Sequence, residues 1–290
     1  MNPVLEYSES MLHELAQSDV ARALQEDVGQ GDLTAALVDP TRQVRARVLA
    51  REAAVICGAP WVEATLQQVV PEAKLTWHVR DSQRCVPDQV VLEIAGPARG
   101  LLTAERTLLN FLQLLSAVAT YTATYVQAVQ SVPGNRAQIV DTRKTLPGLR
   151  LAQKYAVRAG GGTNHRIGLY DAVLIKENHI AAAGGVSAVL QRAAAVAQSA
   201  KFVEIEVETL AQLEEALAAG ATMVLLDNMS LDMLREAVRL NAGRAILEVS
   251  GGVNLSTVRD IAATGVDRIS IGALTKDVKA IDFSMRFEEL

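Results

Sequence analysis

Ionisable side chains and small residues recur in the second half of the sequence, each time directly after a short apolar run. Such side chains can bind anions, orient hydroxyl groups and stabilise charge that develops during a reaction. One polar run end would be unremarkable, but six in succession predict a site assembled from several segments. The six are Asp141-Thr142-Arg143-Lys144, Lys176-Glu177-Asn178-His179, Glu204 with Glu206 and Glu208, Asp227-Asn228, Glu248 with Ser250-Gly251-Gly252, and Ser270-Ile271-Gly272.

The run Phe202–Glu208 is the most informative, because valine and isoleucine alternate there with glutamate. A strand in a parallel barrel is normally apolar on both faces. Three glutamates on one face would cost much desolvation free energy unless cations or hydrogen-bond donors met them. The pattern indicates either an edge strand with a solvated face or a carboxylate cluster that meets basic residues, a metal or sugar hydroxyls.

Basic partners for these carboxylates stand close by in the sequence. Arginine offers a planar fork for carboxylate or phosphate, and lysine offers a compact charge for phosphate. A dense basic cluster is often a solvated helix face, but several members here follow apolar runs or glycines, which favours an anion site. The cluster consists of Arg143, Lys144, Lys154, Arg158, His165, Arg166 and Lys176.

Three glycine-containing segments lie at places where the backbone would have to approach a ligand. Gly160-Gly161-Gly162 directly precedes Thr163-Asn164-His165-Arg166, which indicates either a helix end or a loop that delivers the last two side chains. Ser250-Gly251-Gly252 and Ser270-Ile271-Gly272 close the last two apolar runs. Phosphate sites of β/α barrels often use the loops after the final strands, so these two segments predict a phosphate site.

The elements that must position these residues alternate between strand and helix, which predicts parallel strands with right-handed crossovers. The readable strands are fewer than a complete barrel has, so we expect an α/β fold with an incomplete, open parallel β/α barrel. The predicted strands are Gln138–Asp141, Ala172–Lys176, Val203–Val207, Met223–Asp227, Ile246–Ser250 and Arg268–Gly272. The predicted helices between them are Ala188–Ala200, Leu210–Ala219, Leu231–Leu240 and Thr257–Thr264.

The first part of the chain has a different, mixed pattern. Short helices are expected at Asp19–Gln25 and Trp61–Val70, and extended runs at Arg42–Ala50, Lys74–Arg80 and Val90–Ala95. One long helix, or two, should run from about Arg99 to Gln130. Its polar stripe of Arg106, Asn110, Gln113, Thr120 and Thr124 carries a single charge, which fits solvent and a buried interface equally well. The tail Asp282–Leu290 is expected to pack back on this first region.

Composition places the chain among soluble globular proteins. Half of its 290 residues are hydrophobic, and the net charge of −5 means that any affinity for phosphate must be local. Cys57 and Cys85 have the spacing of neither a metal site nor a disulfide framework. We read no secretory signal in MNPVLEYSES and no apolar run long enough to span a membrane, so we expect a cytoplasmic protein.

The run from Asp141 to Ile180, DTRKTLPGLRLAQKYAVRAGGGTNHRIGLYDAVLIKENHI, resembles quinolinate phosphoribosyltransferases, also called nicotinate-nucleotide pyrophosphorylases (carboxylating). The resemblance extends along nearly the whole chain. EDVGQGDLT from Glu26 resembles the family's N-terminal signature, and Ala104-Glu105-Arg106-Thr107 with Asn110-Phe111 resembles its helix motif. VEIEVETL, LLDNMS, EVSGGVN and RISIGALT follow in the family's order, and only the closing AIDFSMRF fits loosely.

The resemblance implies an N-terminal α/β sandwich domain at residues 1–112, to which residues 275–290 return, and a β/α barrel phosphoribosyltransferase domain at 113–274. It also implies a homodimer, or a higher oligomer, whose active site is shared between chains. Arg106 resembles the arginine that the neighbouring chain contributes to that site. Such a contribution would explain a lone charge on an otherwise apolar helix.

The same resemblance implies roles for the residues at the run ends. Arg143, His165 and Arg166, with help from Lys176, would bind the two carboxylates of quinolinate, and Lys144 and Lys176 would meet the pyrophosphate of phosphoribosyl pyrophosphate (PRPP). Glu206 and Asp227 would hold the ribose hydroxyls, with Mg²⁺ nearby. The catalytic residues would be Lys144, Lys176, Glu206 and Asp227, and the further substrate-binding residues Thr142, Ser250, Gly251, Gly252 and Gly272.

The reaction implied is transfer of phosphoribose to quinolinate with loss of carbon dioxide. It gives nicotinate mononucleotide and pyrophosphate in de novo NAD biosynthesis. Its sugar gains oxocarbenium character, which carboxylates such as Glu206 and Asp227 can stabilise. Mg²⁺ needs only one or two carboxylates besides substrate oxygens, which fits a sequence without a metal motif.

Three other functions remain compatible with the residues alone. The first is a phosphoribosyltransferase for another pyridine acid such as nicotinate, although arginines for a second carboxylate favour quinolinate. The second is an aldolase-like barrel in which Lys144 or Lys176 forms a Schiff base, which borohydride trapping would reveal. The third is a non-catalytic anion-binding protein, for which the glutamates of Phe202–Glu208 have no use.

Overall fold

The computed structural model describes residues 7–289, and the chain divides into two compact units. The N-terminal unit comprises residues 7–123, Leu146–Gly161 and 277–289, and the barrel unit comprises Thr124–Thr145 and Gly162–Lys276. Residues 1–6 and Leu290, which the sequence analysis counted in the first domain and its returning tail, lie outside the described residues. The expected domain boundary at residues 112 and 113 stays a prediction.

The N-terminal unit is built on an antiparallel sheet with the strand order β12-β1-β5-β3. Its strands are β1 (Gln43–Ala50), β3 (Lys74–Trp77), β5 (Val90–Pro97) and β12 (Phe283–Glu289), and a small second sheet joins β2 (Ala54–Val55) to β4 (Arg84–Cys85). Strand β12 pairs with β1 along its length, with Met285 opposite Val48. The closing segment thus returns to the first region, as the sequence predicted.

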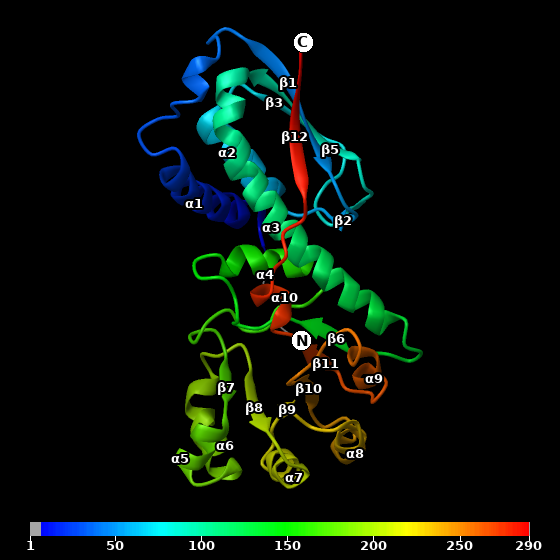
Figure 1. Ribbon diagram of the computed structural model, residues 1–290. Coiled ribbons are helices and arrows are strands. Elements are labelled where there is room, and N and C mark those ends of the chain that lie inside the picture. Colours follow the sequence, from blue (N-terminus) through cyan, green and yellow to red (C-terminus); the bar gives the residue numbers. More distant parts are fainter. Residues whose placement is uncertain (1–6, 290) are drawn as a thin grey trace. The chain divides into compact units, whose positions relative to one another are not determined.

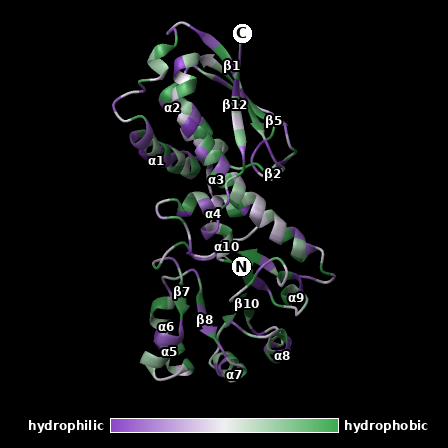
Figure 2. Ribbon diagram, viewed as in Figure 1, coloured by the Kyte–Doolittle hydropathy of each residue, from purple (hydrophilic) through white to green (hydrophobic). Residues whose placement is uncertain are grey.

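Helices α1 (Glu9–Asp27), α2 (Ala59–Val69), α3 (Ala98–Gln130) and α4 (Arg150–Ala159) and the 3-10 turn Ala35–Leu37 complete the helical part of this region. The alternating buried residues of β1 pack into one core with Val62 and Leu66 of α2 and Leu101 and Leu108 of α3. Hydrophobic colouring runs along much of α3 (Figure 2). This packing explains why the long apolar segment forms one continuous helix rather than two.

Two helices of this region differ from the prediction: α1 is longer than expected, and α4 was not predicted. Helix α1 begins ten residues before the predicted Asp19, because Ser8 caps it by accepting the Met11 N–H through its Oγ at 3.2 Å. Helix α4 occupies a stretch interpreted from its basic residues alone, and its strongly one-sided face buries Ala152, Ala156 and Val157. Both misses come from judging polar segments by composition when their apolar face was only a narrow stripe.

The barrel unit contains six parallel strands in the order β6-β11-β10-β9-β8-β7. They are β6 (Gln138–Val140), β7 (Val173–Ile175), β8 (Val203–Val207), β9 (Met223–Asp227), β10 (Ile246–Ser250) and β11 (Arg268–Ser270). Among the described residues β6 and β7 form the two edges, so the predicted open, incomplete barrel is confirmed. The chain passes from β7 to β11 through helices that lie outside the sheet (Figure 1).

These helices are α5 (Glu177–Ala183), α6 (Val186–Ala197), α7 (Leu210–Ala218), α8 (Leu231–Asn241), α9 (Val258–Ala262) and α10 (Ala273–Lys276). Helix α5 was not predicted, because Glu177 to His179 were interpreted as the end of a strand. Within residues 7–289 no single helix has the length and apolar character of a membrane span. Only α5 and α6 taken together have that length and composition, and the two helices are bent by 98° relative to each other.

The parallel sheet brings the polar run ends to one edge, because all its strands share a direction. Residues that follow β6, β7, β8, β9, β10 and β11 therefore meet at the carboxyl ends of the strands. The loop after α4 adds to this edge: the Thr163 N–H donates to the Ile139 carbonyl at 2.8 Å, and Thr163 carries a parallel bridge to Val140. The segment that carries His165 and Arg166 is thereby held against the end of β6.

One prediction concerns the N-terminal unit. Gly58 is the N-cap residue of α2 and has no side chain to cap the helix. Asp81 supplies the cap instead: its Oδ1 accepts the N–H groups of Gly58 and Ala59 at 3.1 Å. Its Oδ2 accepts the Tyr155 hydroxyl at 2.8 Å. Asp81→Ala should lower the free energy of unfolding by about 2 kcal/mol, because it removes a helix cap and leaves a partly buried hydroxyl without its acceptor. Urea unfolding followed by circular dichroism measures this.

Tyr155→Phe is the control for that variant, since it removes only the hydroxyl and should cost about 1 kcal/mol. Equal losses from the two substitutions would contradict the capping role of Asp81.

Candidate active site

A cavity of about 170 Å³ lies in the barrel unit at the carboxyl ends of the strands. Eight residues to which the family resemblance assigned a role line it: Thr142, Arg143, Lys144, His165, Arg166, Lys176, Glu206 and Ser250. Leu174, Leu225, Glu248 and Ser270 complete the lining. The parallel sheet explains the gathering, because the lining residues lie in the middle or at the carboxyl ends of its strands, shortly after them, or in the loop after α4 that carries His165 and Arg166.

Two guanidinium groups form the most buried positive part of the cavity. Arg166 is only 8% exposed and donates through Nη1 to the Ala172 carbonyl at 3.2 Å. Burial, and then repulsion from Arg143, lowers the pKa of Arg166. The Nε of Arg143 is buried and finds no hydrogen-bond partner among residues 7–289. A buried charged donor without a partner is costly, so the geometry favours an anion bound between these two arginines.

An ion pair joins the ends of β7 and β8. The Nζ of Lys176 donates to Glu206 Oε2 at 2.7 Å, and the two side chains are 46% and 11% exposed. The main chain of Lys176 is held as well, because its N–H donates to His179 Nδ1 at 2.9 Å. The pair keeps a lysine and a carboxylate side by side at the rim, where each can also meet a substrate.

Asp227 follows on the next strand and is held by its neighbour. The Asn228 Nδ2 donates to Asp227 Oδ2 at 2.7 Å, while the Asn228 N–H donates to the Ser250 carbonyl at 3.1 Å. Burial raises the pKa of Asp227, and Lys176 and Lys144 oppose that rise. Asp227 does not line the cavity itself, but it ends β9, the strand beside β8, and interacts electrostatically with Lys176 and Lys144, which do line it.

Two glycines predicted to receive phosphate serve to make room for site residues. A Cβ on Gly251 would lie 2.1 Å from Asn228 Oδ1, and a Cβ on Gly272 would lie 2.9 Å from Cδ of Lys144. The Thr275 hydroxyl donates to the Lys144 carbonyl at 2.7 Å, which fixes the backbone there. Gly252 has a left-handed backbone (φ 61°) and lies in the exposed turn after β10.

The three glutamates of the predicted run lie in three different environments. Glu204 is fully buried, Glu206 is at the rim, and Glu208 is exposed beyond the end of β8. The interpretation as a carboxylate cluster that meets basic residues is confirmed for the first two. The edge-strand interpretation is wrong for β8, because β7 and β9 pair with it on both sides.

A buried ionic cluster lies beneath the cavity, and the sequence analysis named three of its members, His165, Glu204 and Glu248, but not Arg268. The Nε2 of His165 lies 2.8 Å from Glu204 Oε2 and 3.5 Å from Glu248 Oε1, and Arg268 Nε donates to Glu248 Oε2 at 2.7 Å. Burial, together with the negative charge of Glu248, raises the pKa of Glu204. A charged residue inside each of three predicted parallel strands was the signal that could have revealed this cluster.

Five further residues considered from the sequence belong to the N-terminal unit. Arg106 and Asn110 are exposed on α3, whereas Thr120 of the same polar stripe accepts the Val55 N–H at 2.8 Å and so has a structural role. On α4, Lys154 is fully buried and Arg158 is exposed. The inclusion of Arg106 in a shared site stays a prediction.

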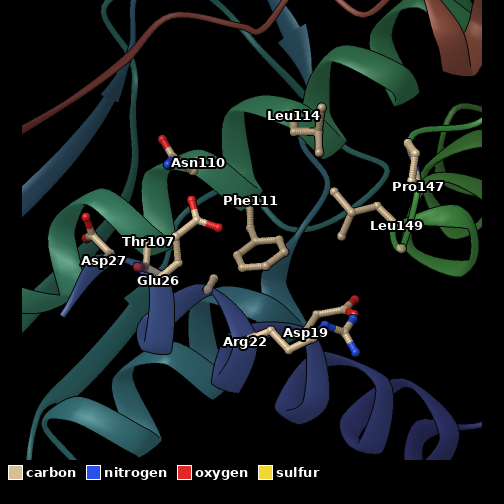
Figure 3. A pocket seen from close by; sticks show the side chains of 12 residues that line it. Asp19, Arg22, Glu26, Asp27, Thr107, Asn110, Phe111, Leu114, Pro147 and Leu149 are labelled. Atoms are coloured by element: carbon tan, nitrogen blue, oxygen red, sulfur yellow. The ribbon is translucent and has the colours of Figure 1, made fainter. Parts of the chain in front are cut away.

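A wider cavity of about 410 Å³ lies in the N-terminal unit, between α1, α3 and the loop at Pro147 (Figure 3). Its buried carboxylate, Asp19, is already engaged by Trp61 Nε1 at 3.0 Å and by Arg22. Thr107, Asn110 and Phe111 from α3 supply the opposite wall. Its ionisable groups do not converge on one point as those of the barrel cavity do, so we place the candidate active site in the barrel unit.

Comparisons with known proteins agree along most of the chain. Residues 118–286 match the family model described as quinolinate phosphoribosyl transferase, C-terminal domain, and residues 32–116 match that of its N-terminal domain. The nicotinate-nucleotide pyrophosphorylase [carboxylating] of Mycobacterium leprae is 42% identical over 277 residues, which cover 93% of this chain and 96% of that protein. A Bacillus subtilis protein named as a probable enzyme of that kind is 40% identical over 260 residues, covering 90% and 89%.

Among solved structures, the nicotinate-nucleotide pyrophosphorylase from Francisella tularensis superposes with a TM-score of 0.91 at 42% identity. The match covers 95% of this chain and 97% of that one.

The contact between Gly251 and Asn228 gives a prediction about stability. Gly251→Ala should lower the free energy of unfolding by about 1–2 kcal/mol for the left-handed backbone and by about 1–3 kcal/mol more for the clash with the Asn228 amide. Gly243→Ala is a matched control, because Gly243 also has positive φ (78°) but no atom within 4 Å of an added Cβ. Thermal unfolding of both variants measures the difference, and equal losses would show that Asn228 yields freely.

Proposed function

The chain belongs to the quinolinate phosphoribosyltransferase family, and we propose on that premise that it transfers phosphoribose from PRPP to quinolinate with loss of carbon dioxide. Its relatives are named nicotinate-nucleotide pyrophosphorylase [carboxylating] and quinolinate phosphoribosyltransferase [decarboxylating], a reaction that makes the protein a pentosyltransferase of de novo NAD biosynthesis. The observation that carries the proposal is the arginine-lined cavity at the strand ends, with carboxylates at its rim.

Quinolinate carries two adjacent carboxylates, and the two cavity arginines suit them. The buried Nε of Arg143 has no hydrogen-bond partner among the described residues, and the positive charges of Arg143 and Arg166 repel each other. Two guanidinium groups can each form charge-assisted hydrogen bonds to one carboxylate, with Lys176 available to the same end of the substrate. His165 stands between them in sequence and lines the same cavity.

The phosphates and ribose of PRPP would occupy the remaining edge. Lys144 and Lys176 lie where they can neutralise pyrophosphate as it leaves, and Glu206 and Asp227 can accept hydrogen bonds from ribose hydroxyls. Thr142, Ser250, Gly251, Gly252 and Gly272 stand at the ends of β6, β10 and β11. Backbone N–H groups at such strand ends suit the 5-phosphate.

Chemistry in this arrangement needs charge stabilisation more than a strong base. As the bond to pyrophosphate breaks, the sugar carbon gains positive character, which the carboxylates of Glu206 and Asp227 stabilise. Attack by the ring nitrogen of quinolinate makes the pyridine ring cationic. The electron pair left when the adjacent carboxylate departs as carbon dioxide is then stabilised by that ring, and the ring carbon takes up a proton from water. Arg143 and Arg166 hold both carboxylates in place until carbon dioxide leaves.

We propose Mg²⁺ as the metal that accompanies PRPP, and the donor set fits it. Glu206 and Asp227 offer oxygen ligands on neighbouring strands, and one or two carboxylates suffice when substrate oxygens and water complete the octahedron. When bound, Mg²⁺ would neutralise charge on the leaving pyrophosphate. Its removal with a chelator should abolish turnover while leaving quinolinate binding measurable by calorimetry.

We also propose that the protein acts as a homodimer in the cytoplasm, with Arg106 of one chain completing the site of the other. Arg106 is exposed on α3, where a partner chain could contact its charge. Its neighbour Glu105 is half-buried, and burial raises the pKa of that carboxyl. The name of a rice relative places that protein in the chloroplast, so fractionation of the source cells is the test of location.

The geometry favours neither Lys176 as a Schiff-base lysine nor a pure anion receptor. A Schiff-base lysine acts as a free nucleophile, whereas the Nζ of Lys176 donates to Glu206 at 2.7 Å. A pure anion receptor would not need Glu206 and Asp227 beside its lysines.

The first experiment incubates purified protein with quinolinate, PRPP and Mg²⁺ and follows nicotinate mononucleotide and carbon dioxide. We expect product from quinolinate and none from nicotinate in a parallel reaction, because nicotinate leaves one guanidinium unpaired. Turnover of nicotinate without carbon dioxide would replace the substrate, and no turnover of either would sink the proposal.

A second experiment tests Asp227 and the shared site together. Asp227→Asn should lower kcat by about 100-fold or more, because it removes a charge that stabilises the transition state. Arg106→Ala should also impair turnover. When the two inactive variants are mixed and allowed to exchange subunits, a shared site predicts recovery of about one quarter of the activity, since half the dimers are mixed and each holds one intact site.

Asp232→Asn, an exposed carboxylate on α8 that pairs with Arg235, is the matched control and should leave kcat unchanged. Absence of recovery on mixing, with subunit exchange shown by native mass spectrometry, would contradict the shared site.

A further inference from the structure

The segment Asn164–Arg166 has no secondary structure of its own, yet it carries a guanidinium of the cavity. Buried acidic groups hold it in place. Asp141, at the end of β6, accepts the His165 N–H through Oδ1 at 2.8 Å and the Asn164 side-chain amide through Oδ2 at 2.6 Å. Asp141 is itself fully buried, so these bonds form away from solvent.

The ring of His165 is engaged at both nitrogens by protein atoms. Its Nδ1 accepts the N–H of Arg166 at 2.7 Å, which leaves Nε2 as the nitrogen that donates to Glu204 Oε2 at 2.8 Å. The ring therefore links the main chain of Arg166 to a fully buried carboxylate on β8. In this arrangement His165 acts as a strut, and its neighbour supplies the charge that faces the cavity.

The far end of the strut is anchored by an ion pair in the sheet. Glu248 on β10 and Arg268 on β11 are direct neighbours in the strand register, and Arg268 Nε donates to Glu248 Oε2 at 2.7 Å. Glu248 Oε1 lies 3.5 Å from His165 Nε2. Both side chains are almost completely buried, so the pair holds Glu248 at a fixed place beside the histidine ring.

This cluster also has the shape of a cation site, since ligand atoms of His165, Glu204 and Glu248 lie within 4.8 Å of one another. However, the guanidinium of Arg268 already supplies positive charge to Glu248, and the His165 Nε2 proton points at Glu204. A metal ion would have to displace both interactions. The geometry therefore favours a permanent hydrogen-bonded frame.

We propose that Glu204 is a positioning residue of the active site. Through His165 it fixes the direction in which Arg166 meets a carboxylate of the substrate. Glu248, Arg268 and Asp141 support Glu204 in this role. The inference rests on the proposed function, because it assigns Arg166 to quinolinate. Misplacement of a binding group by about 1 Å can cost about 100-fold, so a frame of this kind is needed when the arginine stands on a loop.

The central test compares Glu204→Met with Glu204→Gln. Methionine removes the acceptor for His165 Nε2, whereas glutamine keeps an acceptor oxygen at the same length of side chain. We expect Glu204→Met to raise the KM for quinolinate by about 10- to 100-fold, with the KM for PRPP changed by about threefold or less. Glu204→Gln should restore a quinolinate KM close to that of the unmodified protein.

A double-variant cycle separates a strut from two independent contacts. If Glu204 acts through His165, Glu204→Met should add little to the effect of His165→Ala when the two are combined. Multiplicative effects on the quinolinate KM would overturn the proposal. So would a folded Glu204→Met variant with an unchanged quinolinate KM, or one in which both KM values and kcat shift together.

Asp141→Asn provides a second route if Glu204→Met does not fold. The amide keeps only one acceptor oxygen for the two donors that Asp141 now holds, so the same selective rise in the quinolinate KM is expected. Glu236→Met is the matched control, because Glu236 lies on α8 in an exposed pair with Arg239 and should change nothing.

Failure of this inference can be told apart from failure of the proposed function. An unmodified protein that turns over quinolinate, together with variants that keep its quinolinate KM, overturns the strut alone. An unmodified protein that neither turns over quinolinate nor binds it in calorimetry overturns the function itself.

Discussion

The barrel unit depends on one constraint, the placing of four ionisable groups in the interior of a parallel sheet. A buried charge without a partner costs several kcal/mol, and a parallel sheet covered on both faces offers no solvent. A chain of contacts between neighbouring elements meets that constraint. It runs from Arg268 on β11 to Glu248 on β10, then to His165 in the loop after α4, and ends at Glu204 on β8. Arg268 neutralises Glu248 and the His165 ring donates to Glu204, so loss of Arg268 would leave a buried carboxylate without its cation and loss of His165 would leave Glu204 without this donor.

The three glutamates in and directly after β8 differ in how far they are buried. Glu204 is sealed in the interior, Glu206 forms an ion pair with Lys176 at the rim, and Glu208 is exposed beyond the strand. Alternation along a strand puts all three on one face, but solvent access changes with every second residue toward the carboxyl end. One short sequence thus supplies a structural anchor and a group that can meet substrate.

Glycines in the site act mainly by making room. Gly251 leaves space for the Asn228 amide that holds Asp227, and Gly272 leaves space for the side chain of Lys144. Phosphate binding by backbone N–H groups remains compatible with both positions. The close approaches add a second reason why a side chain is excluded there, independent of any ligand.

The sequence alone determined the order of strands and helices, the open β/α barrel and the residues at the strand ends, because hydrophobic period and strand-end polarity are local properties. It did not determine α4, whose residues were interpreted from their charges rather than from its apolar face, or α5, whose first residues were interpreted as the end of a strand. It also did not reveal that Glu248 and Arg268 face each other. Only strand register, a property of the tertiary fold, makes Arg268 the neighbour of Glu248 and brings both beside His165, far away in the chain.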